Sequence, residues 1–145
     1  MKRALITGSS GHVGSNLVRK LSELDYKIRC IDFDGDHRAY EGYDVEIIKG
    51  DITDKDSLYE IFEGVDVVFH TAALINLDRR YREAIEFVNI EGTRNVCEVA
   101  LEKVKAKNEI RILESALEFI HIEIEWNHKN RLVLTQTFIH LMLKK

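Results

Sequence analysis

The sequence predicts an α/β fold in which helices cover both faces of a parallel sheet. Through about residue 105, short apolar runs alternate with longer stretches whose apolar residues recur at helical spacing. This alternation is typical of a doubly wound parallel sheet. All eight glycines lie at or before Gly92, and the final 53 residues contain neither glycine nor proline. We therefore expect a truncated sheet of four parallel strands, with a fifth as an open alternative, followed by an atypical C-terminal tail.

The expected elements follow the apolar pattern along the chain. Strands are predicted at 4–7, 28–32, 45–48 and 65–70, and helices over 13–24, 55–62 and 80–105. Asp54 is the predicted N-cap of the second helix, because its carboxylate accepts hydrogen bonds from the free first-turn amides. Gly64 is predicted to end that helix in the left-handed conformation.

The turn between the first strand and the first helix carries three glycines in the segment TGSSGHVG, residues 7–14. Gly8 permits the tight turn, Gly11 lets the backbone approach a pyrophosphate, and Gly14 lets the helix pack closely. The first helical amides lack internal partners and attract a diphosphate. The pattern predicts a dinucleotide site, with a turn that holds no ligand as the alternative. The expected contacts in this turn are Gly8, Ser10, Gly11, His12, Val13 and Gly14.

A carboxylate at the end of the second strand indicates which dinucleotide binds. Asp32 lies 18 residues beyond Gly14, where it can accept hydrogen bonds from both hydroxyls of an adenosine ribose. The same carboxylate would repel a 2′-phosphate, so the sequence favours NAD over NADP. Arg38 lies nearby and keeps NADP as the less favoured alternative. A solvated strand end is the other interpretation of Asp32.

Four motifs in chain order resemble those of the extended short-chain dehydrogenase/reductases. They are TGSSGHVG at 7–14, GDITD at 50–54, VVFHTAA at 67–73 and VNIEGTRNV at 88–96. Within that group the chain is most similar to the branch of NAD-dependent epimerases/dehydratases, 3β-hydroxysteroid dehydrogenases and dihydroflavonol reductases. The resemblance covers about residues 2–106. It implies a Rossmann-type NAD(P)-binding domain over 1–107, followed by a tail over 108–145 that does not resemble the family.

The resemblance also implies cofactor contacts outside the glycine-rich turn. Asp51 would accept from the exocyclic amine of adenine and Ile52 would pack on the ring, although Asp51 also suits a turn. Small residues after the fourth strand would let the backbone run beneath the nicotinamide ribose. Asn89 would brace the fourth and fifth strands or order a proton-relay water. The contacts implied in this way are Asp51, Ile52, Thr71, Ala72, Ala73 and Asn89. We assign His70 no catalytic role.

The chemistry implied by the resemblance needs a Tyr-X-X-X-Lys pair, in which tyrosine is the acid/base and lysine lowers its pKa. None of the five tyrosines has a lysine four positions later. Ser115 matches the family serine only weakly. We therefore expect no catalytic residue, and binding without turnover by a truncated or frame-shifted family member. The alternative is a non-catalytic module that senses a nucleotide or binds a partner.

The tail allows more than one interpretation. Period-two alternation over 117–126 predicts a strand, and a helix over 109–126 is nearly as good. The apolar stretch 132–143 ends in two lysines, which suits a helix C-terminus.

Composition limits the partners and the compartment. The net charge of −4 argues against nucleic acid, and no apolar run reaches the length of a membrane span. We expect no metal site, and we expect Cys30 and Cys97 to be buried free thiols in a cytoplasmic protein. The expected partners are a dinucleotide, a small-molecule substrate only if missing parts complete the site, and a second copy of the chain, because a truncated sheet leaves an edge strand uncovered.

Overall fold

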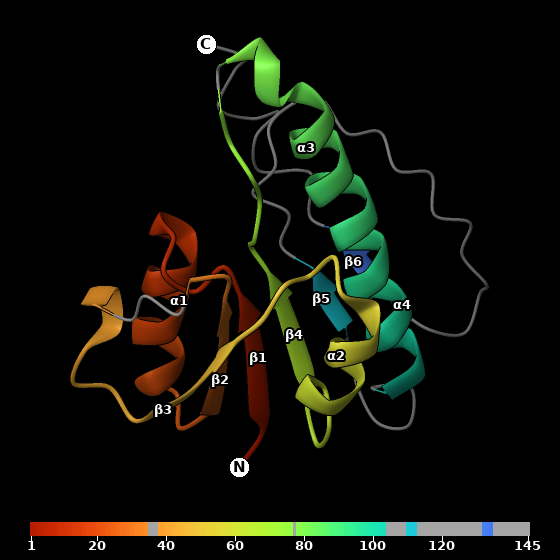
Figure 1. Ribbon diagram of the computed structural model, residues 1–145. Coiled ribbons are helices and arrows are strands. Elements are labelled where there is room, and N and C mark those ends of the chain that lie inside the picture. The colour runs from red at the N-terminus through yellow and green to blue at the C-terminus, as the bar shows by residue number, and fades with distance from the viewer. Residues whose placement is uncertain (35–37, 77, 104–109, 113–131, 135–145) are drawn as a thin grey trace, which may run out of the picture.

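A four-stranded parallel sheet forms the centre of the protein (Figure 1). The computed structural model describes residues 1–34, 38–76, 78–103, 110–112 and 132–134. The strands are β1 (Arg3–Thr7), β2 (Lys27–Asp32), β3 (Val45–Lys49) and β4 (Val67–His70), and their order in the sheet is β3-β2-β1-β4. Thr7 lies opposite Ile31 on one side and His70 on the other. The strands therefore end together at one edge, where the loops that follow them meet.

Helices cover both faces of this sheet, as the sequence predicts (Figure 1). The α-helices are α1 (His12–Ser22), α2 (Lys55–Ile61), α3 (Arg82–Phe87) and α4 (Thr93–Lys103). Shorter helical segments are η1 (Arg38–Tyr40), η2 (Arg79–Tyr81) and the π-helix η3 (Val88–Gly92). Among the described residues, no helix has the length and apolar character needed to cross a bilayer.

Alternate residues of β1 supply the two cores. Ala4 and Ile6 face α1 and pack with its buried residue Val18. Leu5 points to the opposite face and packs with residues of α2 and α4, among them Leu58. Both faces of a parallel strand are buried in such a fold, which is why the strands read as nearly continuous apolar runs.

Local signals at α2 act as predicted. The Asp54 side chain accepts from the Ser57 amide at 3.4 Å, and Gly64 adopts a left-handed φ of +70° just after the helix. The chain reversal before β2 uses Asp25, a non-glycine residue with φ +58°. Cys30 and Cys97 are buried and lie outside any disulfide, as expected. Burial raises the pKa of the Cys30 thiol to about 11.

The helix predicted over 80–105 is interrupted. It consists of η2, α3, η3 and α4 in succession, so the π-helical turn at Val88–Gly92 was not anticipated. A π-turn inserts one residue into an otherwise helical ladder. The apolar spacing changes too little for sequence periodicity to report it.

The tail contains two short strands, β5 (Ile110–Ile112) and β6 (Leu132–Leu134), which pair in parallel as a separate sheet. β5 lies beside β4 (Figure 1). A helix over 109–126 is therefore wrong at Ile110–Ile112, and helix over 132–143 is wrong at Leu132–Leu134. Isoleucine and valine, which occur in these two segments, favour strands. The strand predicted at 117–126 and Ser115 lie outside the described residues.

Candidate functional site

A cavity of about 520 Å³ opens at the carboxyl ends of the parallel strands. Open α/β sheets bind their ligands at this edge. Nine of the predicted site residues line the cavity: Gly8, Ser10, Gly11, Asp32, Asp51, Ile52, Thr71, Ala72 and Ala73. Four do not: His12, Val13 and Gly14 belong to the first turn of α1, and Asn89 belongs to η3. The structure thus brings together residues from four separate loops of the sequence.

The glycine-rich turn packs between α1 and the segment after β4. Gly8 has φ +67°, and a Cβ atom there would lie 2.6 Å from the Ala72 Cα. A Cβ atom at Gly14 would lie 2.3 Å from the Gly8 carbonyl oxygen. The Gly8 amide donates to the Ile31 carbonyl at 2.9 Å, which ties the turn to β2. Only glycine fits both positions, so the turn and the helix start are held in one arrangement.

The N-terminus of α1 faces this turn with its backbone amides. Gly11 is the N-cap residue, and no side chain caps the helix there. His12 and Val13 are exposed, while Gly14 is buried. Amides of a first helical turn lack intrahelical acceptors and lie at the positive end of the helix dipole. This arrangement suits an anion such as a diphosphate.

The Asp32 carboxylate is held by a network of hydrogen bonds at the end of β2. Its Oδ1 accepts from the Ser10 amide and the Ser10 hydroxyl, both at 3.0 Å. Its Oδ2 accepts from the Tyr40 hydroxyl at 2.7 Å and from the Ser9 hydroxyl. Asp32 is only 3% exposed. The carboxylate predicted to bind ribose is therefore fixed in orientation by the glycine-rich turn and by η1.

Tyr40 is a site residue that sequence reasoning missed. Its side chain is 2% exposed, and burial raises the pKa of its phenol above the usual value, so the hydroxyl remains a donor. The signal available was an aromatic residue in a polar stretch eight positions after Asp32. Its contact with Asp32 depends on how the segment after β2 folds back, which local pattern does not report. Arg38, considered for a 2′-phosphate, is exposed at the start of the same short helix.

The loop after β3 is braced from both sides. Asp51 Oδ1 accepts from the Thr53 amide and the Thr53 hydroxyl, both at 2.8 Å, which is the turn role considered for this residue. The Asn95 amide of α4 donates to the Ile52 and Thr53 carbonyls at 3.1 and 3.2 Å. Ile52 is 7% exposed. Asn95 was not singled out from the sequence, although it lies within the fourth family motif.

Gly92 lets η3 approach this loop closely. A Cβ atom there would lie 2.5 Å from the Ile52 Cδ1. The backbone of η3 at Gly92 therefore packs directly on the Ile52 side chain of the loop after β3.

Asn89 fastens the segment that leaves β4. Its Oδ1 accepts from the Leu74 amide at 2.8 Å and its Nδ2 donates to the Leu74 carbonyl at 3.0 Å. The Thr71 hydroxyl donates to the Thr7 carbonyl at 2.7 Å. These contacts hold the backbone of 71–74 along the cavity wall.

His70 is a hydrogen-bonded core residue. Its Nδ1 lies 2.6 Å from the Thr7 hydroxyl and its Nε2 lies 2.9 Å from the Thr93 hydroxyl. Burial lowers the pKa of the imidazole to about 4. The ring is therefore neutral near pH 7 and links β1, β4 and α4.

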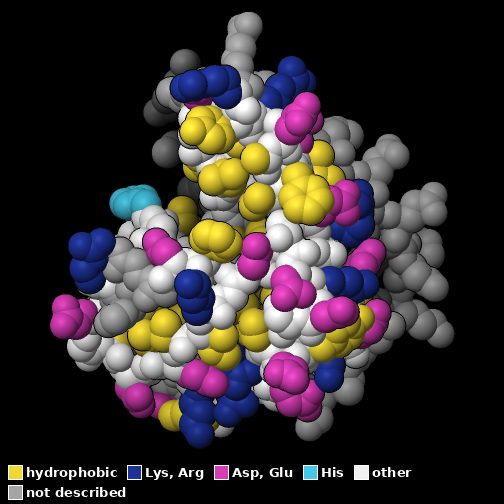
Figure 2. Space-filling model, viewed as in Figure 1, with side chains coloured by type: hydrophobic (Ala, Val, Ile, Leu, Met, Phe, Trp, Pro, Cys, Tyr) yellow, Lys and Arg dark blue, Asp and Glu magenta, His cyan; other side chains and the backbone are white. Residues whose placement is uncertain are grey.

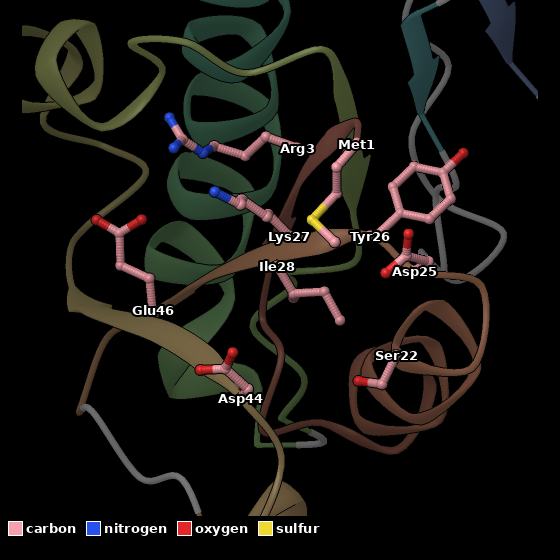
Figure 3. Close-up of a pocket in the computed structure, with 9 residues that line it drawn as sticks. All are labelled: Met1, Arg3, Ser22, Asp25, Tyr26, Lys27, Ile28, Asp44 and Glu46. Atoms are coloured by element: carbon pink, nitrogen blue, oxygen red, sulfur yellow. The ribbon is translucent and has the colours of Figure 1, made fainter.

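A second cavity, of about 410 Å³, lies at the opposite edge of the sheet. Figure 3 shows that its walls come from the amino ends of β1 and β2, the end of α1 and the segment entering β3, with Arg3, Lys27 and Glu46 among its charged residues. It has no glycine-rich turn and no helix N-terminus. Among the described residues, no group of three or more potential metal ligands occurs.

Comparison with known proteins assigns the family. The model of the 3-beta hydroxysteroid dehydrogenase/isomerase family matches residues 5–120. The chain belongs to this family. The resemblance to the extended short-chain dehydrogenase/reductases is thereby confirmed.

Individual relatives agree with this assignment. A UDP-N-acetyl-alpha-D-glucosaminuronate decarboxylase of Bacillus cytotoxicus is 34% identical over 110 residues, which cover 72% of this chain and 34% of the relative. A 3 beta-hydroxysteroid dehydrogenase/Delta 5→4-isomerase of Mycobacterium tuberculosis is 37% identical over 101 residues, covering 65% of this chain and 27% of the relative.

A solved structure gives the same fold. A short-chain dehydrogenase/reductase superfamily protein from Agrobacterium tumefaciens, crystallised with bound NAD, has a TM-score of 0.65 and 26% identity, covering 77% of this chain and 32% of that one. The chain thus spans about a third of the length of the relatives that it matches.

Proposed function

We propose that the chain is the NAD-binding portion of an epimerase/dehydratase-like or hydroxysteroid-dehydrogenase-like oxidoreductase. The single observation that carries this proposal is the cavity at the carboxyl edge, where an uncapped helix start, a glycine turn and Asp32 lie together. These groups match, in order, a diphosphate and an adenosine ribose. The NAD bound in a solved relative of the same fold supports the choice of cofactor.

The residues present fit the dinucleotide along its length. The amides of His12, Val13 and Gly14 would hold the diphosphate, and Asp32 would accept from the ribose hydroxyls. Asp51 and Ile52 would contact adenine. Thr71, Ala72 and Ala73, which also line the cavity, would lie beneath the nicotinamide ribose, and Asn89 holds the backbone that follows them through Leu74. Bound NAD supplies the hydride acceptor for oxidation of a secondary alcohol.

We further propose that this chain binds the cofactor without turnover. The chemistry of the family needs a tyrosine held near a lysine, and none of the five tyrosines has a lysine four positions later. The NAD-binding domain is assigned to residues 1–107 and the tail to residues 108–145. We propose a cytoplasmic location, because the two cysteines are buried and form no disulfide.

The test is calorimetric titration of NAD and NADP into the wild type and into the Asp32→Ala variant. The proposal expects NAD to bind the wild type more tightly than NADP, because Asp32 opposes the 2′-phosphate. Asp32→Ala is expected to lose most of this preference. Tyr43→Phe is the control, because Tyr43 lies near η1 and is 39% exposed. Equal binding of both dinucleotides by the wild type would reject NAD specificity, and no binding would reject the function.

A partner-binding module is the second candidate, favoured by an exposed apolar surface beside the cavity. Leu74, Ile75, Tyr81 and Phe87 are 38%, 61%, 50% and 56% exposed. Figure 2 shows hydrophobic side chains gathered over α3 and the segment that precedes it. Exposed apolar surfaces of this kind mark interaction sites. The mass measured by size-exclusion chromatography with light scattering tests self-association: a dimer supports it, and a monomer at all concentrations rejects it.

A further inference from the structure

We propose that the Ser10 hydroxyl and a ribose hydroxyl of the dinucleotide compete for the same acceptor position on Asp32, so that binding exchanges one donor for the other. This inference rests on the proposed function, because it requires the ribose to bind at Asp32. It adds a residue, Ser10, whose side chain opposes binding while its backbone supports it.

The protein itself fills the acceptor positions of the Asp32 carboxylate. A carboxylate offers about four lone-pair positions. Ser10 fills two on Oδ1 through its amide and its hydroxyl. Ser9 and Tyr40 fill two on Oδ2. A ribose hydroxyl that donates to Asp32 must therefore displace one of these donors.

The burial of the four donors indicates which of them a ribose hydroxyl can displace. Ser9 and Tyr40 are 0% and 2% exposed, and their hydroxyls lie 3.1 Å apart. Displacing either would disturb packed core. The Ser10 amide belongs to the backbone of the glycine-rich turn and is equally fixed.

The Ser10 side chain differs from the other donors. It is half-buried and lines the cavity beside Asp32. Rotation about its Cα–Cβ bond moves the hydroxyl away from Oδ1 without moving backbone, and staggered rotamers make such a rotation inexpensive. The exchangeable position on Asp32 is thus the one that faces the cavity.

The exchange predicts that removal of the Ser10 hydroxyl raises the affinity for the dinucleotide. A side chain that occupies the ribose position multiplies the apparent affinity by the fraction of time that this position is free. Replacing Ser10 with alanine removes this competitor and keeps the amide donor. A simple contact residue would behave in the opposite way, since its removal would weaken binding.

The experiment compares ADP with 2′,3′-dideoxy-ADP, which lacks both ribose hydroxyls, by calorimetry. We expect Ser10→Ala to bind ADP about three- to tenfold more tightly than the wild type, which is the size of one typical net hydrogen bond. The affinity for the dideoxy compound should stay unchanged. Ser22→Ala is the matched control, because the Ser22 hydroxyl donates to the Val18 carbonyl in its own helix. Ser10→Gly also removes the hydroxyl and replaces Ser10→Ala if that variant misfolds.

The possible failures are distinguishable. Wild-type protein that binds neither NAD nor ADP overturns the proposed function together with this inference. Wild-type binding that is unchanged or weakened by Ser10→Ala overturns the exchange alone. Equal tightening of ADP and the dideoxy compound also overturns it, because the gain would not involve the ribose. If Tyr40→Phe binds ADP more tightly and Ser10→Ala does not, the displaced donor is Tyr40, and the role proposed for Ser10 is overturned.

Discussion

At the residue scale, Gly8 joins the candidate site to the stability of the fold. It combines a left-handed φ of +67° with backbone of Ala72 within 2.6 Å of a built Cβ atom. Gly42 has a left-handed φ of +91° with nothing within 4 Å. A comparison of alanine substitutions at the two glycines therefore separates the free-energy cost of backbone strain from the cost of the close approach to Ala72.

We predict that Gly8→Ala lowers the free energy of unfolding by about 3 kcal/mol or more, as the sum of strain and overpacking. Gly42→Ala is expected to cost about 1 kcal/mol, from strain alone. Urea denaturation of both variants measures the difference. Equal losses would show that the approach of Ala72 does not constrain the turn.

His70 makes the stability depend on pH. Burial lowers the pKa of its imidazole from 6.5 to about 4, so the unfolded chain binds a proton that the folded chain excludes. The stability is then fully present above pH 6.5 and is lost as the pH falls toward 4. A shift of this size corresponds to about 3 kcal/mol by pH 4.

The prediction is a fall in unfolding free energy between pH 6.5 and 4 that His70→Gln removes. Urea unfolding at a series of pH values measures the slope. The variant is less stable at pH 7, because the links to Thr7 and Thr93 are lost, but the slope is the decisive quantity. An equal slope in both proteins would assign the pH dependence to other groups.

At the element scale, one interrupted helix holds two walls of the cavity. Asn89 in η3 bonds Leu74 after β4, and Asn95 in α4 bonds Ile52 and Thr53 after β3. A π-turn rotates the residues that follow it relative to a regular helix. The two asparagines thus bind the loops that follow β4 and β3, which are the two edge strands of the four-stranded sheet.

Asn89→Ala is predicted to cost about 2–3 kcal/mol, because the Leu74 amide and carbonyl both lose their partner. Asn16→Ala is the control, since the exposed Asn16 amide donates to the His12 carbonyl in its own helix and its loss should cost under about 0.5 kcal/mol. Urea midpoints compare the two. Similar costs would contradict the bracing role of Asn89.

The same elements show how far the sequence predicts this structure. The strands β1, β2 and β4 were predictable because they bury both faces, and the caps because Asp54 and Gly64 act through their immediate neighbours. The π-turn and the partners of Asp32 were not, since they depend on which distant backbone segments meet. In the tail, the apolar residues have no turn signals between them and suit a helix and a strand equally well. The structure forms strands at Ile110–Ile112 and Leu132–Leu134.

At the scale of the whole molecule, the chain contains the cavity proposed for NAD and spans about a third of the length of its relatives. We predict that it binds NAD without reducing it when 3β-hydroxysteroids or UDP-sugars are supplied. The reason is the missing tyrosine–lysine pair. Absorbance at the NADH band measures turnover, with a full-length family enzyme as the positive control. NADH formation above background would contradict the prediction.

An amide chemical-shift titration with NAD tests whether the diphosphate binds at the start of α1. We expect the amides of His12, Val13 and Gly14 to shift together with that of Ser10. The amides of Tyr26 and Lys27, in the cavity at the opposite edge of the sheet (Figure 3), should remain unchanged. Shifts at Tyr26 and Lys27 with an unperturbed α1 start would show that NAD does not bind at the glycine-rich turn.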